Sequence, residues 1–127
     1  MIRTFVDSDI LIWHLRGDPN ARGFFEARIE EGSELWIGAL QRAEVTFFMR
    51  EREVPHTLHF LSHFKTAPVT QDVVDDGATL YRHWNRSHGV DVNDAILAAT
   101  VMARGGRIFT LNLKHYPMPD LPVYRGW

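Results

Sequence analysis

The chain has 127 residues and contains no cysteine. Disulfide bonds and thiolate zinc sites are therefore excluded, and the composition fits a reducing compartment. No apolar run reaches the roughly 18 residues that a membrane-spanning helix needs. The first residues form a strand-like run in place of a signal peptide, so we expect a cytoplasmic protein that makes no membrane contact.

Lysine is also scarce, because 12 of the 14 basic residues are arginine. The formal net charge of −2 argues against a strongly basic nucleic-acid-binding protein. Arginine binds planar phosphate groups through paired hydrogen bonds, however, so local contacts to a phosphate backbone remain open.

Repeats, low-complexity tracts and linkers are absent, so residues 1–127 are expected to form one domain that is long enough to bury its own core. Short apolar runs predict strands at residues 2–6, 35–37, 67–69, 108–111 and 121–124. Helical patterns lie between them at residues 10–15, 21–31, 40–53, 56–64, 73–87 and 94–103. This alternation predicts an α/β fold with a mostly parallel five-stranded sheet and helices on both faces.

Two acids, Asp7 and Asp9, follow the first predicted strand in the stretch FVDSDILI. Parallel sheets bind ligands beyond the carboxyl ends of their strands, which is where Asp7 should lie. Asp7 or Ser8 can equally serve as the cap of the helix that follows. Asp9 is expected to face solvent or to cap the same helix.

Glu44 lies on the predicted helix at residues 40–53. In a continuous helix it shares one face with Leu40, Phe47 and Phe48, so an acid interrupts an apolar stripe. A buried carboxylate is relieved by protonation, by an ion pair or by a metal ion. The alternative is an acid at the edge of the stripe that reaches solvent or pairs with an arginine.

Asp91 and Asp94 precede the helical run in GVDVNDAILAATVMARGG. Their spacing predicts a capping box, which accounts for Asp91. Asp94 shares its helix face with Ala98 and Val101 and should therefore point toward packed structure. Small residues on this helix allow it to approach the sheet closely, which could bring Asp94 near Asp7.

Oxygen donors dominate these candidate ligands. Cysteine is absent, and no pair of histidines has the spacing of a zinc site. His56, His59 and His63 recur on one helix face, but a solvated surface explains them. The donor set therefore favours Mg²⁺ or Mn²⁺ over zinc.

Four segments in this order resemble the PIN-domain nucleases, specifically the VapC-type toxins of toxin–antitoxin pairs: FVDSDILIW, IGALQRAEV, DVNDAILAAT and IFTLNLKHYP. The resemblance covers essentially the whole chain and implies a metal-dependent endoribonuclease. It implies that Asp7, Glu44 and Asp94 bind the catalytic Mg²⁺ or Mn²⁺. The partners it implies are an RNA substrate, a cognate VapB-like antitoxin and a second copy in a homodimer.

The resemblance also implies residues around the metal. Thr110 and Asn112 match the loop beside the site, and the family often has a fourth acid where this chain has His115. Asp91 and His115 are therefore further candidate metal ligands. Basic residues beside the motifs are candidate phosphate contacts or ordinary surface charges, namely Arg42, Arg86 and Lys114. The aromatic residues available for base stacking are Trp13, Trp84 and Tyr116, although core packing is the better explanation for Trp13 and Trp84.

Residues 46–64, TFFMREREVPHTLHFLSHF, carry many large apolar side chains on two helical patterns separated at Pro55. A contiguous exposed patch there would mark an interface for a second copy or for an amphipathic antitoxin segment. The alternative is that these side chains fill the core.

Two other functions remain open from the sequence. The Asp-x-Asp motif also resembles that of haloacid-dehalogenase-like phosphotransferases, in which Asp7 would be the nucleophile. A polar, helix-like stretch precedes Asp91 where that family has an apolar strand, and Ile10 and Leu11 replace its usual Gly-Thr. A catalytically silent PIN-fold binding module is the second alternative, supported only by His115 and opposed by the other three acids.

Overall fold

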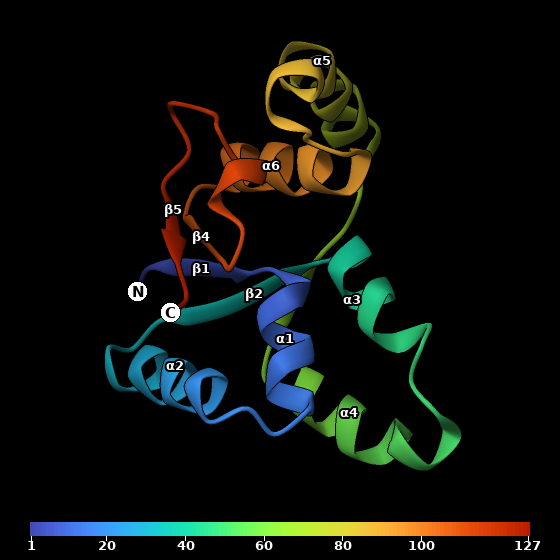
Figure 1. Cartoon of the computed structure of the whole chain (residues 1–127), viewed down its shortest axis with the longest axis vertical. Coiled ribbons are helices and arrows are strands. Elements are labelled where there is room, and N and C mark those ends of the chain that lie inside the picture. The colour runs from blue at the N-terminus through green and yellow to red at the C-terminus, as the bar shows by residue number, and fades with distance from the viewer.

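A five-stranded parallel sheet forms the middle layer of the molecule (Figure 1). The computed structural model describes residues 1–127. The strands are β1 (Arg3–Val6), β2 (Glu34–Gly38), β3 (Lys65–Ala67), β4 (Arg107–Thr110) and β5 (Val123–Arg125), in the spatial order β3-β2-β1-β4-β5. Every neighbouring pair is parallel, which confirms the predicted fold class.

Helices cover both faces of this sheet (Figure 1). One face carries α5 (Gln71–His88) and α6 (Val92–Arg104), and the other carries α1 (Ser8–Leu15), α2 (Pro19–Glu30) and α4 (Val54–Leu61). Helix α3 (Ala39–Thr46) continues from the end of β2, and two short 3₁₀ helices occur at η1 (Glu51–Glu53) and η2 (Leu113–His115). No helix combines the length and the apolarity that crossing a membrane requires.

Two hydrophobic clusters follow from the alternation of side chains along the central strand. Phe5 packs with residues of α6, including Ala98 and Val101, whereas Val6 packs with residues of α1 and α2. Successive side chains of a strand point to opposite faces, so β1 is buried on both sides. The small residues of α6 allow the close approach to the sheet that the sequence predicted.

The predicted helix at residues 40–53 is wrong beyond Thr46. Helix α3 ends there, and Phe47 and Phe48 are 81% and 83% exposed, so they form no buried stripe with Glu44. Pro55 lies in the first turn of α4, where a residue without an amide hydrogen is tolerated, and a new helix begins there.

The predicted strand at residues 67–69 is displaced by two residues. Strand β3 ends at Ala67, because Pro68 has no N–H to donate to the neighbouring strand.

The connection between α6 and β4 is tight. Gly106 has φ +123°, and a Cβ at this position would lie 2.3 Å from the carbonyl oxygen of Arg3. Only glycine fits such a conformation beside another backbone. This turn places β4 beside β1 and thereby sets the position of Thr110 relative to Asp7.

Candidate functional site

The carboxyl ends of the two central strands meet at the candidate site. Asp7 follows β1 directly, and its backbone N–H donates to the carbonyl of Phe109 in β4 at 3.0 Å. Thr110 is the last residue of β4. Because β1 and β4 are parallel neighbours, side chains that follow either strand lie at the same edge of the sheet.

Asp7 is buried and its carboxylate is held by three donors. Oδ1 accepts from the backbone N–H of Ser8 at 2.8 Å, which makes Asp7 the N-cap of α1. Oδ2 accepts from the hydroxyls of Thr110 at 3.1 Å and Tyr116 at 2.7 Å. Asp7 therefore caps its helix and also presents a fixed carboxylate at the sheet edge.

Asp94 lies in the first turn of α6, on the same side of this edge. The Tyr116 hydroxyl is 3.3 Å from its Oδ1, so one phenol joins Asp94 to Asp7. The other oxygen, Oδ2, lies 3.2 Å from Nδ1 of His115. The predicted proximity of Asp7 and Asp94 is confirmed, and Tyr116 provides the connection.

Asp91 serves as the N-cap of α6, as predicted. Its Oδ1 accepts from the backbone N–H of Asp94 at 2.8 Å, and the backbone N–H of Asp91 donates to Oδ2 of Asp94 at 3.3 Å. This capping box orients the Asp94 carboxylate toward the sheet.

Glu44 is half-buried on α3. Burial raises its pKa, as do the charges of Asp7 and Asp91, while hydrogen bonding with Ser8 and Asn93 opposes the shift. Glu44 therefore belongs to the same group of acids. The predicted apolar stripe with Phe47 and Phe48 does not exist, because both rings are exposed.

The electrostatics of the three acids are similar. Burial raises the pKa of Asp94 to about 7, assisted by the charges of Asp91 and Asp7. Burial also raises the pKa of Asp7, and the charge of Asp9 adds to this effect. Like charges in a desolvated place disfavour ionisation, and a bound cation reverses that effect.

A divalent cation fits the chemistry of this donor set. No three Asp, Glu or His side chains are arranged as a complete metal site, and Tyr116 bridges Asp7 and Asp94 instead. Burial together with the nearby carboxylates raises the pKa of Tyr116 well above its ordinary value, so the phenol remains a proton donor. Carboxylate oxygens with raised pKa values are suitable ligands for Mg²⁺ or Mn²⁺.

Asp9 has a structural role that the sequence did not reveal. Its Oδ2 accepts from the backbone N–H of Leu111 at 2.9 Å and from the Thr110 hydroxyl at 3.2 Å. Asp9 is therefore not merely a surface or capping residue, because it ties the end of β4 to α1.

The predicted substrate residues lie in different surroundings. Thr110 is fully buried, so its hydroxyl orients Asp7 and Asp9 and cannot reach a substrate. Asn112 and Lys114 are exposed beside η2, and the Asn112 amide lies 3.1 Å from Nε2 of His115.

Two arginines were also predicted to contact phosphate. Arg42 points toward β3, with Nη1 3.5 Å from the Thr66 hydroxyl, and Arg86 is exposed on α5. The structure therefore brings neither guanidinium into a contact with the three acids.

Tyr116 is the site residue that sequence reasoning missed. It was predicted to stack on bases, but it is only 4% exposed and its hydroxyl contacts two acids. The sequence around Tyr116, His-Tyr-Pro, does not distinguish a tyrosine that hydrogen-bonds to acids from an aromatic residue of the core. Trp84 also packs against the hydrophobic core, whereas Trp13 is partly exposed, so only Trp13 remains available for stacking.

Comparison with known proteins shows the family to which the chain belongs. The PIN domain family matches residues 4–119. Ribonuclease VapC19 of Mycobacterium tuberculosis is 35% identical over 122 residues, which cover 94% of this chain and 98% of that protein. The chain belongs to the PIN-domain family and is homologous to the VapC ribonuclease toxins. Ribonuclease VapC10 of the same organism is 33% identical over 89% of this chain and 85% of its own.

Solved structures share the same PIN fold. A toxin–antitoxin complex from Klebsiella pneumoniae aligns with a TM-score of 0.83 and 22% identity over 98% of both chains. A DNA-bound VapBC from Salmonella typhimurium aligns with a TM-score of 0.81 and 16% identity over the whole of both chains. The haloacid-dehalogenase-like interpretation is thereby excluded, because the PIN match includes the Asp7–Asp9 motif.

Proposed function

We propose that this PIN domain is a divalent-metal-dependent endoribonuclease that hydrolyses RNA phosphodiester bonds. The observation that carries the proposal is the gathering of Asp7, Glu44 and Asp94 at one sheet edge, each with a raised pKa. The relatives named as ribonucleases support the reaction class. An RNA target and the absence of cysteine support a cytoplasmic location.

Asp7, Glu44 and Asp94 would hold Mg²⁺ or Mn²⁺. When bound, such an ion polarises the phosphate, lowers the pKa of bound water and neutralises charge in the transition state. The protein holds the carboxylates in place, since Thr110 and Tyr116 donate to Asp7, and the capping box of Asp91 positions Asp94. His115 and Asp91 are proposed as additional ligands because both lie against Asp94.

Phosphate contacts are proposed for the exposed polar residues beside the acids. Lys114 and Asn112 lie next to His115 on η2, which in turn contacts Asp94. Arg42, which is partly buried with its guanidinium near Thr66, is on α3, the helix that carries Glu44, and would have to turn from Thr66 to reach a phosphate. These residues are suited to neutralise and orient a phosphodiester that approaches the carboxylates.

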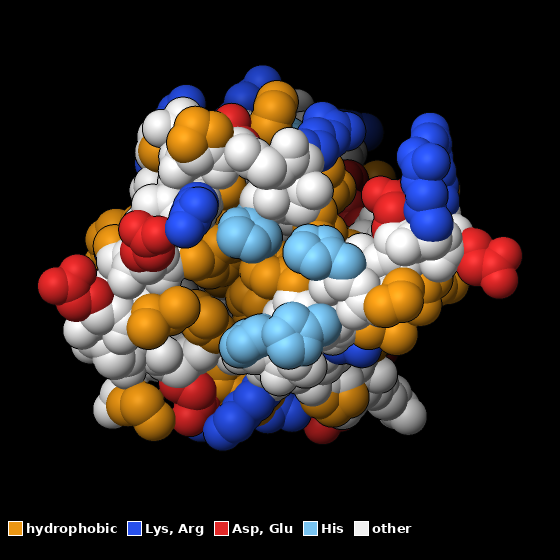
Figure 2. Space-filling view, turned by 90° about the horizontal axis from the view of Figure 1, so that it is seen from below, with side chains coloured by type: hydrophobic (Ala, Val, Ile, Leu, Met, Phe, Trp, Pro, Cys, Tyr) orange, Lys and Arg blue, Asp and Glu red, His pale blue; other side chains and the backbone are white.

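A cognate VapB-like antitoxin is proposed as the protein partner, as in the toxin–antitoxin complexes that share this fold. Figure 2 shows histidine side chains around an apolar hollow on one face of the molecule. A cavity of about 480 Å³ there is lined by His14, Phe25, Phe60 and His63 from α1, α2 and α4 and their flanks. An apolar hollow of this kind suits an amphipathic antitoxin segment.

The predicted interface segment at residues 46–64 is divided by the fold. Leu61 and Phe64 are core residues, whereas Leu58 on α4 is 40% exposed. Exposed Phe47, at the end of α3, supports the proposed homodimer. Light scattering of the purified chain tests the dimer, and co-purification with the product of the adjacent open reading frame tests the antitoxin.

Substitution of the three acids tests the nuclease. Asp7→Asn, Glu44→Gln and Asp94→Asn should each reduce cleavage of total RNA in Mg²⁺ or Mn²⁺ by about a hundredfold or more. Asp120→Asn, an exposed acid in the loop before β5, serves as the control and should cleave at the parent rate. Circular dichroism should show that all four variants are folded.

Other results would contradict the proposal. Cleavage that persists in excess EDTA, or an Asp7→Asn protein with the parent rate, would exclude the metal nuclease. A parent protein that binds RNA without cleaving it under any of these conditions would favour the silent binding module.

A further inference from the structure

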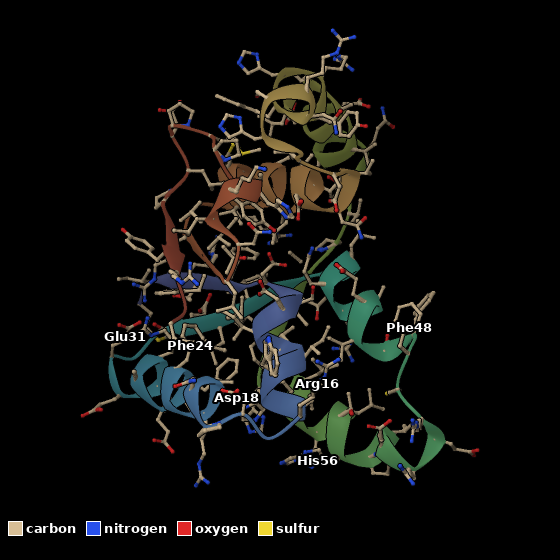
Figure 3. The ribbon with its side chains drawn as sticks, viewed as in Figure 1. Arg16, Asp18, Phe24, Glu31, Phe48 and His56 are labelled. Atoms are coloured by element: carbon tan, nitrogen blue, oxygen red, sulfur yellow. The ribbon has the colours of Figure 1, made fainter.

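A cavity of about 790 Å³ opens between α1, α3, η1 and α4, and its wall includes Glu44. Figure 3 shows Arg16, Phe48 and His56 around this space, each from a different segment of the chain. Its inner lining is apolar and includes Ile12 and Val45. Because Glu44 belongs to both, the cavity meets the cluster of acids described above at Glu44.

Unpaired positive charge lies along this cavity. Arg16, Arg50 and Arg52 line it, all three are exposed, and none forms an ion pair. The one acid in the wall besides Glu44 is Glu53, whose Oε1 accepts the backbone N–H of Arg50 at 2.8 Å.

Three arginines at the opposite end of the sheet are neutralised. There the ion pairs are Arg3–Glu34, Arg28–Glu31 and Arg107–Glu31. The arginines of the cavity differ from these three, because their guanidinium groups are free to contact an anionic ligand beside Glu44, although the chain as a whole is slightly acidic.

Exposed aromatic surface accompanies these arginines. Phe48 lines the cavity and is 83% exposed. Trp13 is 42% exposed, and the Arg16 guanidinium lies 5.4 Å from the centre of its ring. Proteins bind single-stranded nucleic acid through this combination, because bases stack on aromatic rings while arginines contact phosphates.

We propose that this cavity, the arginine groove, binds the single-stranded RNA that flanks the phosphodiester to be cleaved. Arg16, Arg50 and Arg52 contact its phosphates, a base stacks on Phe48, and the strand passes along Glu44 toward the other acids. The inference rests on the proposed function.

A protein segment is the less favoured occupant, because it explains neither the unpaired arginines nor the position of Glu44 in the wall. Bases in a duplex are stacked on one another, so the groove requires single-stranded RNA.

Salt-dependent binding tests the role of the arginines. Fluorescence anisotropy with a fluorescein-labelled single-stranded RNA is measured on the full chain carrying Asp7→Asn, which keeps the probe intact. For single strands the slope of log K against log salt changes by about 0.7 for each phosphate contact. The double variant Arg50→Gln/Arg52→Gln should therefore lose about 1.4 from the slope, and Arg16→Gln about 0.7.

The control variant removes two positive charges at positions outside the groove. Arg82→Gln/Arg104→Gln removes two exposed arginines, one on α5 and one at the end of α6 opposite to Asp94, and should leave the slope unchanged. A groove double variant that keeps the parent slope and affinity would overturn the proposal.

A second pair of variants tests stacking. Phe48→Ala should weaken RNA binding about tenfold with an unchanged salt slope, because it removes an aromatic surface and no charge. Tyr124→Ala is the control, since Tyr124 is 50% exposed on β5 and does not line the groove. Equal affinities of these two variants would overturn the stacking contact.

The remaining outcomes separate this proposal from the nuclease itself. If groove variants alter the oligomeric state in light scattering and leave RNA affinity intact, the groove is an interface between copies and the proposal fails. If metal-dependent cleavage is found but RNA affinity does not depend on the arginines, RNA binding in the groove is contradicted and the nuclease function is supported. If RNA affinity depends on the groove residues but the parent protein does not cleave RNA, RNA binding in the groove is supported and the nuclease function is contradicted.

Discussion

The Tyr116 hydroxyl donates a hydrogen bond of 2.7 Å to Oδ2 of Asp7, between two side chains that lie 109 positions apart and are both buried. The same hydroxyl is 3.3 Å from Oδ1 of Asp94. The other oxygen of Asp7, Oδ1, accepts only the Ser8 N–H and has a second lone pair, so it can still face a cation. Tyr116 is thus placed to orient two of the proposed metal ligands.

We expect Tyr116→Phe to weaken Mn²⁺ binding about tenfold, because residues that orient metal ligands typically contribute this much to metal affinity. Isothermal titration calorimetry measures the affinity directly, without reference to cleavage. Tyr124→Phe is the control, because Tyr124 is 50% exposed on β5 and its hydroxyl contacts none of the acids. Equal Mn²⁺ affinity of Tyr116→Phe and the parent would exclude the orienting role.

The contribution of Asp94 to the stability of the metal-free protein should fall as the pH rises. Burial and neighbouring charges raise the pKa of Asp94 from 3.8 to about 7. Folding therefore favours the protonated carboxyl, and the associated stability is present below about pH 4 and lost through about pH 7. We expect Asp94 to contribute a decrease of about 1–3 kcal/mol in the free energy of unfolding over this range.

Urea denaturation in EDTA at several pH values measures this effect. Asp94→Asn should be less sensitive to pH than the parent, whereas Asp120→Asn should follow the parent. Added Mn²⁺ should stabilise the parent most near neutral pH, where the carboxylates are ionised. A difference in the free energy of unfolding between the parent and Asp94→Asn that stays constant from about pH 4 to about pH 7 in EDTA would contradict this effect of burial on Asp94.

Nδ1 of His115 lies 3.2 Å from Oδ2 of Asp94, one of the proposed metal ligands. We expect His115→Asp to raise Mn²⁺ affinity, because it adds a carboxylate beside the proposed ligands, and to lower the stability of the metal-free protein through repulsion. His115→Ala should weaken Mn²⁺ binding. Weaker RNA binding by His115→Asp with unchanged Mn²⁺ affinity would instead identify His115 as a phosphate contact.

The turn at Gly106 should tolerate no side chain. Gly106→Ala introduces a Cβ against the Arg3 carbonyl at φ +123°, so we expect a loss of about 2 kcal/mol or more in the free energy of unfolding. Gly23→Ala is the matched control within α2, where nothing lies within 4 Å of the added Cβ. It should stabilise the protein by about 0.5–1 kcal/mol, since alanine favours a helix interior. Thermal denaturation of both variants measures these changes. A Gly106→Ala protein as stable as the parent would contradict the conclusion that only glycine fits at this turn.

Local patterns were sufficient to predict the elements that depend on nearby residues. The alternation of apolar runs and helical periods predicted the parallel sheet, and the spacing of Asp91 and Asp94 predicted the capping box. The order of the four motifs identified the PIN family, and resemblance to that family led to the proposal that Asp7, Glu44 and Asp94 hold the metal. These properties were accessible because strand formation, helix capping and family motifs depend on short-range sequence.

The predictions that failed concern burial. A helical period placed Phe47 and Phe48 inside, but α3 ends at Thr46 and leaves both rings exposed. The same ending gives the arginine groove its aromatic edge. No local pattern specifies where a helix with few capping signals stops, because packing against neighbouring elements decides it.

Tyr116, Asp9 and Thr110 show what the tertiary structure alone decided. In the sequence, Tyr116 belongs to a short aromatic pattern, and Asp9 repeats the charge of Asp7. Parallel pairing of β1 with β4 brings positions more than 100 residues apart together, so that the Thr110 hydroxyl lies within hydrogen-bonding distance of both acids and Tyr116 donates to Asp7. The sequence by itself determined which acids are available, whereas long-range pairing decided how they are held, because hydrogen bonds act over about 3 Å and leave no periodic trace along the chain.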